Sequence, residues 1–482
     1  MRRNNQSSTQ TYLEAVSVSD RLVNDLTTGS VSRKLLLFSV PIILANLMQT
    51  LYNIWDMVVV GKFVDSAGLA AVANGGDIMG LTYVLCLGFS TAGQILIAQY
   101  VGSKDSAGVR KTIGTMFSFL GLLSIALTVL GIASIDWLLT AMNVPAEARV
   151  FAREYCVVIF LGLVFIFGYN AISAILRGMG DSKRPLIIIS AATLLFLILD
   201  PILVRKMGVR GAAIATVIAQ GTSCIGSVVY LYTRRKAFGL DIGRGSFTMD
   251  GAVLKSFLKL GLPMALQFGA VIISKLLVNA HINSYGVTAS AVTGIGTKIG
   301  LVASIVTTAF GTASASMIAQ SFGAGKLERI VKTIRVSLGW GLIFTSTLSL
   351  LFFLFTEEIF GLFSRDPAVL ALSHSYLVIA LLNFNGFALR TPMMALINGL
   401  GNGKLNIMVG ILDGVVARLG LALLMGITLG MGIQGFWYGN VLAGYVPFII
   451  GGMYYLSGVW KRQKLAIDPR PPEAGQPVSI GG

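Results

Sequence analysis

The sequence predicts an all-α polytopic membrane protein with twelve transmembrane helices, arranged as two six-helix lobes related by an internal repeat. Three observations support this fold class: the composition, a series of long uncharged runs, and motifs that recur in order. The 482 residues have a mean hydropathy of +0.78; 55% of them are hydrophobic and 12% are charged. Soluble globular proteins contain about 25% charged residues, so this chain does not belong to that class.

Uncharged runs long enough to cross a bilayer recur along the chain, since a transmembrane helix needs about 20 apolar residues. The longest, 419–460, would form one helix of about 63 Å, twice the hydrocarbon core of about 30 Å. It must therefore contain two spans, with the reversal at the glycines of GMGIQG (430–435), which brings the total to twelve. The other runs include residues 78–103, 112–135, 155–176, 211–233, 299–325 and 336–356.

The net charge of +16 arises from 37 Lys and Arg against 21 Asp and Glu. In a soluble protein this excess would suggest nucleic acid, but here the bases lie mostly in loops, so no nucleic-acid partner is expected. With the N-terminus in the cytoplasm, most of the bases lie on the cytoplasmic side, in agreement with the positive-inside rule. We therefore expect a multi-pass plasma-membrane protein with both termini in the cytoplasm. The basic segment VRKMGVR (204–210), on the outer side, is an exception that this arrangement does not explain.

Several motifs of the first half recur in the same order in the second half, about 221 residues later. Six spans separate the copies, so both have the same orientation in the membrane. They are parallel repeats, which are typical of secondary transporters. The matching pairs are IAQYVGSK (97–104) with IAQSFGAGK (318–326), LRGMGDSK (176–183) with INGLGNGK (397–404), MGVRGAA (207–213) with MGIQGFW (431–437), and Pro41 with Pro263.

The repeat and the polar segments divide the chain into five parts. Residues 31–235 and 253–460 are predicted to form the two lobes, and the Gly-rich residues 236–252 are predicted to be a cytoplasmic linker. Residues 1–30 are expected to be a polar cytoplasmic tail without the apolar core of a signal peptide. Residues 461–482 are expected to be a disordered cytoplasmic tail.

Asp56 is the single charged residue between Leu35 and Val60. A carboxylate at the centre of a span costs about 2.5–3.5 kcal/mol on insertion scales, and such residues are functional by default. Gln49 and Asn53 lie on the same helical face and can offer hydrogen bonds. The competing interpretation is a structural pair between Asp56 and a buried base.

Together these segments resemble the multidrug and toxic compound extrusion (MATE) family, on its bacterial side. The resemblance rests on QTLYNIWDMVVVG, GFSTAGQILIAQYVGSKD, ILRGMGDSKRP, LDPIL and GAAIATVIAQ, and it covers about residues 30–460. It implies twelve helices in two lobes around a central cavity that opens alternately to each side. It also implies export of amphiphilic, often cationic compounds, driven by inward H⁺ or Na⁺.

The resemblance also assigns roles to single residues. The family's first-helix acid matches Asp56, its helix-bending proline matches Pro41, its fifth-helix acid matches Asp200, and a sixth-helix threonine matches Thr216. Many members have Asn one turn before the fifth-helix acid, where this chain has Phe196. That departure predicts a thinner polar network around Asp200.

Other charged residues of the spans allow two interpretations each. Asp200 precedes Pro201, so it could instead have a role at a helix end. Asp413 could form an internal salt bridge with Arg418, which we favour, or contribute to a cavity in the second lobe. The basic residues Lys275, His281 and Lys298 could repel cations or pair with Asp413, and Asp77 is expected to be an acid at a helix start.

The leading functional hypothesis is thus an ion-coupled exporter, and a lipid-linked precursor flippase of related architecture is the alternative. An enzyme is not expected, since the chain has two histidines far apart and neither HExxH nor GxSxG. No cofactor is expected beyond the coupling ion, and Na⁺ at Asp56 or Asp200 is the only metal ion expected. The expected partners are small amphiphilic substrates and the bilayer, and we expect a monomer.

Overall fold

The computed structural model describes residues 24–64, 66–235 and 248–466, and no strand occurs within them. In a bilayer every backbone N–H and C=O must find its partner within the protein, which an apolar chain achieves by forming helices. The first half contains α2 (Val31–Phe63), α3 (Ser66–Gly102), α4 (Ser106–Ala141), α5 (Ala146–Leu161), α6 (Leu163–Gly178), α7 (Lys183–Met207) and α8 (Val209–Thr233). The second half contains α9 (Gly251–Asn283), α10 (Val287–Gly323), α11 (Leu327–Leu354), α12 (Thr356–Gly361), α13 (Pro367–Gly399), α14 (Gly403–Val409), the π-helical η3 (Gly410–Ala417), α15 (Arg418–Leu423), the π-helical η4 (Leu424–Thr428), α16 (Gly432–Ala443), α17 (Val446–Leu456) and the 3₁₀ turn η5 (Val459–Arg462).

The twelve predicted spans can be traced in the described residues. Ten helices there are long and apolar enough to cross a membrane, and the pair α5 and α6, bent by 48°, makes an eleventh span. The twelfth is the pair α16 and α17, which two residues separate. The predicted reversal within 430–435 is correct, since η4 ends at Thr428 and α16 begins at Gly432.

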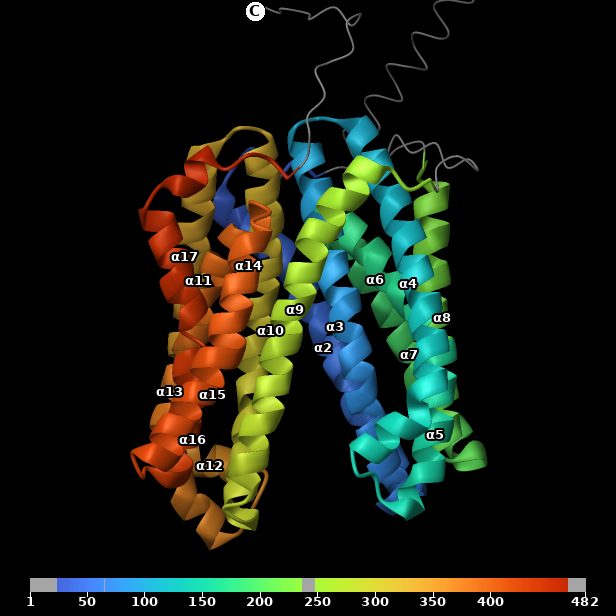
Figure 1. Ribbon diagram of the computed structural model, residues 1–482, viewed down its shortest axis with the longest axis vertical. Helices are drawn as coiled ribbons and strands as arrows, with labels where there is room; N and C mark the ends of the chain where they lie inside the picture. The colour runs from blue at the N-terminus through green and yellow to red at the C-terminus, as the bar shows by residue number, and fades with distance from the viewer. Residues whose placement is uncertain (1–23, 65, 236–247, 467–482) are drawn as a thin grey trace, which may run out of the picture.

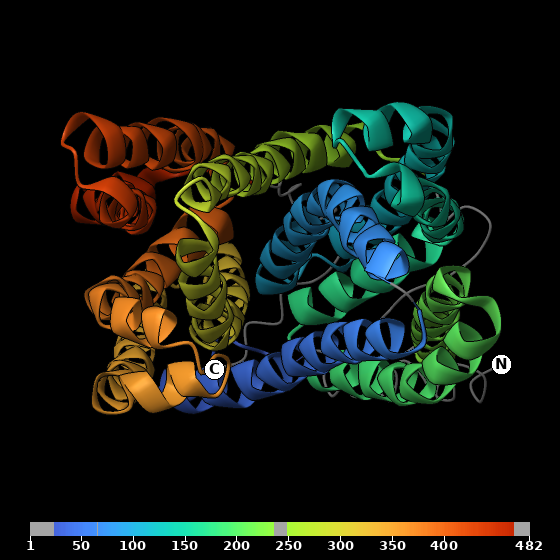
Figure 2. The same cartoon turned by 90° about the horizontal axis from the view of Figure 1, so that it is seen from below.

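The helices form two groups, which we call the first lobe (α2 to α8) and the second lobe (α9 to α17). Figure 1 shows that the two lobes meet at the end where α9 begins and diverge toward the opposite end. Figure 2, viewed from below, shows the two groups side by side. In this view α2 and α9 each extend from one group toward the other. We call the end where the lobes meet the closed end and the opposite end the open end.

Two glutamines at matching positions of the repeat join the lobes at the closed end. Nε2 of Gln99, in α3, donates a hydrogen bond to the carbonyl oxygen of Gly399 in the second lobe, at 3.0 Å. Nε2 of Gln320, in α10, donates to the carbonyl oxygen of Gly178 in the first lobe, also at 3.0 Å. Both glutamines are fully buried. The repeat therefore closes this end with two reciprocal hydrogen bonds.

Two glycines bring the backbones of α3 and α10 into direct contact beside these glutamines. A Cβ atom on Gly102 would lie 2.0 Å from the carbonyl oxygen of Gln320, and one on Gly323 would lie 2.1 Å from that of Gln99. No side chain larger than hydrogen fits at either position without moving the opposite helix.

The segments that flank the lobes also take part in the closed end. The N–H of Leu26 donates to Oε1 of Gln320, and the N–H of Ala466 donates to Oε1 of Gln99. The guanidinium of Arg329 donates to the carbonyl oxygens of Leu26, Thr28 and Gly29. The expectation of a disordered tail is thus wrong for residues 461–466, because these contacts and η5 order them. The remainder of that tail, residues 1–23 and most of the linker lie outside the described residues.

The basic segment 204–210 is a helix junction with almost no loop. Met207 ends α7 and Val209 begins α8, so only Gly208 lies between the two helices. Its φ of 58° lies in the left-handed region, which glycine adopts without strain. The bases Arg205 and Lys206 therefore lie in the last turn of α7, where cations interact favourably with the helix dipole.

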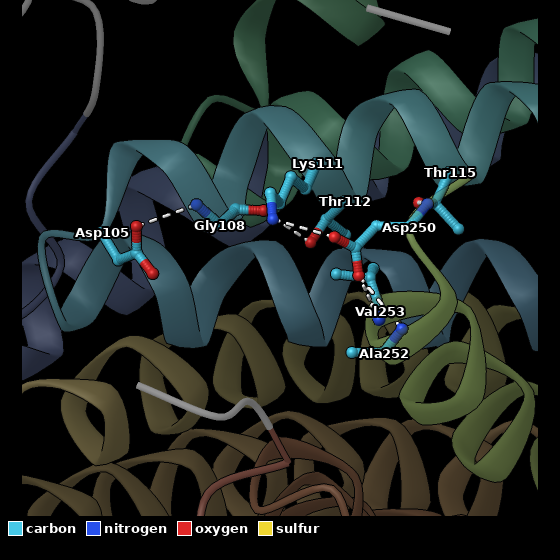
Figure 3. A network of polar contacts seen from close by, with 8 residues as sticks. All are labelled: Asp105, Gly108, Lys111, Thr112, Thr115, Asp250, Ala252 and Val253. Carbon is cyan, nitrogen blue, oxygen red and sulfur yellow. Dashed lines mark hydrogen bonds and ion pairs between the residues drawn. The ribbon is translucent and has the colours of Figure 1, made fainter. Parts of the chain in front are cut away.

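A polar network connects the end of the linker to the first lobe (Figure 3). Asp250 caps α9, because its Oδ1 accepts hydrogen bonds from the N–H groups of Ala252 and Val253. Its Oδ2 lies 2.9 Å from Nζ of Lys111 in α4, and its own N–H donates to Oγ1 of Thr115. The hydrogen bond from Lys111 is the main reason why the pKa of Asp250 lies below its ordinary value.

Asp250→Ala is expected to lower the melting temperature of the purified protein. Loss of an N-cap alone costs about 1 kcal/mol, and the bond to Lys111 is lost with it. Since folding lowers the pKa of Asp250, its contribution is present above the ordinary carboxyl pKa of about 3.9 and disappears as the pH falls through the lowered value. The difference from wild type should thus shrink in acid. Asp105→Ala removes the N-cap of α4, which is a hydrogen bond from the N–H of Gly108 to the Asp105 carboxylate. This substitution should have a smaller effect. An equal effect would mean that Lys111 contributes nothing.

Candidate functional site: an acidic pocket in the first lobe

The first lobe encloses a pocket of about 330 Å³ among α2, α3, α5, α6, α7 and α8. This volume lies at the lower end of the range for small-molecule sites, about 300–1,000 Å³. Its wall is largely apolar and aromatic. Asp56 is the one acidic residue that lines it, and no Lys, Arg or His does so. The polar lining residues include Gln49, Tyr52, Asn53, Asp56, Tyr83, Asn170, Thr193, Thr216, Gln220 and Ser223.

The helical repeat of α2 presents several polar groups to this pocket. Tyr52 and Asn53 lie three and four residues after Gln49, and Asp56 lies four and three residues after them, so the four share one face of the helix. Asp56 is 7% exposed, and its Oδ1 has no hydrogen-bond partner among the described residues. A carboxylate oxygen that is buried without a partner is costly, and it is an available ligand for a cation or a proton.

Asp200 lies close to this pocket but does not line it. It is fully buried in α7, and neither of its carboxyl oxygens has a hydrogen-bond partner among the described residues. Asp56 is near enough to interact with it electrostatically. The ring of Phe196 packs against the ring of Tyr52 with centroids 3.8 Å apart. Phe196 therefore occupies the position one turn before Asp200 with an apolar ring, which offers Asp200 no hydrogen bond.

The structure thus separates the residues that the sequence analysis singled out. Gln49, Asn53, Asp56 and Thr216 come together in the pocket, and Asp200 lies behind its wall. The other predicted residues lie elsewhere: Pro41 is buried in the part of α2 near the closed end, and Asp413 is in the second lobe.

Asp413 forms the salt bridge that the sequence analysis favoured. Its Oδ1 lies 2.6 Å from a terminal guanidinium nitrogen of Arg418, whose other terminal nitrogen donates to the carbonyl and side-chain oxygens of Asn440. The pair is separated by five residues, a spacing that does not share one face of an α-helix. The π-helical turns of η3 place the two side chains together.

Sequence reasoning missed several residues of the pocket and of the spans. Arg390 was not recognised as a residue within a span, although it lies inside α13 (Pro367–Gly399). Tyr52 and Tyr83 were not proposed as pocket residues, because an aromatic residue in an apolar helix usually signals packing. The identity of Gln99 and Gln320 across the repeat was a usable signal for the closed end.

This arrangement, with two helical lobes in one chain and a buried acidic pocket inside one of them, defines a polytopic membrane protein of the transporter class. The family model MatE matches the chain twice, over residues 41–202 and 263–423, one match in each lobe. The chain belongs to the MATE transporter family.

Curated relatives match over nearly their whole length. The probable multidrug resistance protein YoeA of Bacillus subtilis is 28% identical over 90% of this chain and 96% of its own. The probable multidrug resistance protein YpnP of the same organism is 26% identical over 92% and 98%. The probable multidrug resistance protein NorM of Thermotoga maritima is 25% identical over 92% and 96%.

Solved structures share the fold. An outward-facing multidrug resistance MATE transporter of the MOP superfamily superposes with a TM-score of 0.84, at 23% identity, over 91% of this chain and 98% of its own. A MOP superfamily transporter from Pyrococcus furiosus also gives a TM-score of 0.84, at 22% identity and the same coverage.

Proposed function

We propose that this protein is a secondary active transporter of the cell membrane. In this proposal it exports amphiphilic, often cationic compounds in exchange for inward H⁺ or Na⁺ by alternating access. The observation that carries the proposal is Asp56, a buried carboxylate with an unpartnered oxygen in a pocket whose wall is largely apolar and aromatic. Such a wall accepts a hydrophobic body, and the carboxylate can attract its positive charge.

The coupling follows from competition for one carboxylate. A deprotonated Asp56 can hold a cationic substrate or Na⁺, while a protonated Asp56 has no charge with which to hold either. Low dielectric disfavours a buried charge that has no partner, so the empty, ionised site favours occupation by one of these ions. Asp200 can share this role, because it interacts electrostatically with Asp56. Binding of the coupling ion would then release the substrate, and binding of the substrate would release the coupling ion.

The relatives and the pocket both favour drug export over lipid-headgroup transport. The relatives compared above are named for multidrug resistance. No Lys, Arg or His is among the residues that line the first-lobe pocket. A polyanionic lipid headgroup would find no counter-charge there.

The test is uptake of ethidium into proteoliposomes of the purified protein under an imposed pH gradient or Na⁺ gradient. We expect one of the two gradients to drive accumulation of the dye, and collapse of that gradient to stop it. Liposomes without protein give the background. Equal dye movement with and without both gradients would refute the exchange mechanism.

Both termini are expected in the cytoplasm, with the closed end on that side. An alkaline phosphatase fused to the C-terminus, which is active only outside the cytoplasm, should give no activity. The same enzyme inserted at Ser364, in the connection between α12 and α13 at the open end, should be active. The reverse pattern would invert the orientation.

Pro41→Ala is expected to preserve insertion and reduce the transport rate. Proline removes one hydrogen bond within a helix and strains the preceding turn, so Pro41 can act as the bending point of α2. Pro185→Ala is the matched control, because Pro185 lies in the first turn of α7, where the missing N–H breaks no bond within the helix. Full transport by the Pro41 variant would exclude a role in gating.

A further inference from the structure

The second lobe holds a cluster of cations without enough acids to balance them. Arg390 and Arg418, from α13 and α15, and the acid Asp413 of η3 all lie within electrostatic range of Lys275 in α9. Asp413 is the single acid between residues 367 and 466. The remaining acids of the described second lobe lie near helix ends: Asp250, Glu328, Glu357, Glu358 and Asp366. Three cations thus face one carboxylate.

The partners of this cluster leave two cations uncompensated. Arg418 takes the carboxylate of Asp413, and its Nε, in a side chain that is 3% exposed, has no hydrogen-bond partner among the described residues. The guanidinium of Arg390 lies over the ring of Phe387, 4.5 Å from its centroid. Neither Arg390 nor Lys275 has an ion pair within the described part of the chain.

Unbalanced cations inside the membrane are costly, and they mark substrate or ion sites. An exposed Lys at the end of a helix can extend to the lipid headgroups, but Lys275 is followed by two further turns of α9. Val271, one turn before Lys275, lies against Gly414 of η3, so this part of α9 packs on the helix that carries Asp413. The side chain of Lys275 is exposed beside this contact. Among the described residues the cluster thus lacks a second partner of negative charge.

The repeat relates two residues of this cluster to the acidic pocket. Lys275 follows Pro263 at the distance at which Asn53 follows Pro41, and Asn53 lines the pocket. Asp413 follows Lys404 at the distance at which Ala192 follows Lys183, and Ala192 lines the pocket as well. Lys275 and Asp413 thus occupy second-lobe positions equivalent to residues that line the first-lobe pocket.

We propose that Lys275, Arg390 and Arg418 form a binding site for an oxyanion, a carboxylate or phosphate carried by an amphiphilic molecule. This inference deepens the proposed function, and rests on it, because it assigns to the transporter substrates that carry negative charge or both charges. Lys275 and Arg390 contact the oxyanion, and Arg418, held by Asp413 and Asn440, supplies its free N–H. His281, in a later turn of α9, and Lys298, in α10, add no negative charge to the site.

The experiment measures binding of two rhodamines that differ by one negative charge: a rhodamine with a free carboxylate and its ethyl ester. The protein is held in nanodiscs of phosphatidylcholine, a lipid without net charge. We expect wild type to bind the free carboxylate about tenfold more tightly than the ester, the factor expected for one additional hydrogen bond to a charged group. Lys275→Gln combined with Arg390→Gln should remove this preference and leave the affinity for the ester unchanged.

The matched control is Lys298→Gln, which removes an exposed cation of α10 from outside the cluster and should retain the preference. Equal affinity of wild type for the two rhodamines in phosphatidylcholine would overturn the proposal, and so would a preference that survives the double substitution. If the preference exists in phosphatidylcholine and is lost by competition in nanodiscs of phosphatidylglycerol, the site is real and an anionic lipid headgroup also occupies it.

The outcome can be separated from that of the proposed function. Binding is measured without any ion gradient, so it does not depend on exchange. A wild-type protein that prefers the carboxylate but transports neither dye would retain the oxyanion site and refute ion-coupled export. Transport of the ester without a binding preference would support export and refute the oxyanion site.

Discussion

Asp56→Asn is expected to abolish export of cationic dyes against a gradient while leaving a folded, inserted protein. Asparagine has nearly the shape of aspartate but cannot ionise, so the pocket loses its only carboxylate without losing volume. Attraction between a cation and a carboxylate is worth several times more in a protein interior than in water. We expect the rate of uphill export to fall at least about tenfold, the factor that corresponds to about 1.4 kcal/mol. The measurement is dye transport by reconstituted protein after a jump in pH or Na⁺.

Asp77→Asn is the matched control. Asp77 is an exposed acid well inside α3, not at a helix start as expected from the sequence, and it does not line the pocket. Its transport should equal that of wild type. Asp200→Asn tests whether the second acid is also needed, and we expect a loss that is less complete, since Asp200 lies behind the pocket wall. Export by Asp56→Asn at the wild-type rate, with unchanged ion dependence, would make this carboxylate structural.

Gly102→Ala is expected to force the two lobes apart at the closed end. The added Cβ would lie 2.0 Å from the carbonyl oxygen of Gln320, so either α3 or α10 must move. Overpacking of this kind costs about 1–3 kcal/mol, and the strain falls on the closed conformation alone. The matched substitution in the other repeat, Gly323→Ala, meets the carbonyl oxygen of Gln99 at 2.1 Å and should act in the same way.

The measurement is labelling of Ser321→Cys, a fully buried position beside Gln320, by a water-soluble maleimide. The native residues Cys86, Cys156 and Cys224 are replaced first. Labelling should be slow in the parent protein and faster with either glycine substitution. Gly339→Ala, which has nothing within 4 Å of its added Cβ, should leave labelling unchanged. Slow labelling of all four proteins would show that the closed end tolerates the added methyl group.

Much of the fold was accessible from the sequence because a bilayer leaves few choices. An uncharged run of sufficient length must be a helix that spans, so the twelve spans and the reversal near Gly430 followed from lengths and charges alone. Asp56 was recognisable for the same reason, since a single carboxylate stands out in an apolar run. The repeat predicted that two equivalent halves exist.

The contacts between elements could not be predicted in this way. That Gln99 bonds across to Gly399, and not within its own lobe, depends on how the lobes approach each other, which no local pattern encodes. Phe196 was recognised as a departure, but its packing on Tyr52 depends on the distance between α2 and α7. The pairing of Asp413 with Arg418 needed the π-helical turns of η3, and residue spacing read as an α-helix would place the two side chains on different faces.

The reciprocal glutamine contacts have a consequence for the energy of conformational exchange. Each glutamine makes two hydrogen bonds at the closed end, one to a carbonyl of the opposite lobe and one from a flanking segment. Water can replace every one of these bonds when the lobes separate, so each contributes only about 0.5–1.5 kcal/mol net. The four together contribute a few kcal/mol, and a difference of that size leaves the minor conformation populated at about 0.1–10%. Hydrogen bonds that water can replace thus stabilise the closed end while leaving the other conformation accessible.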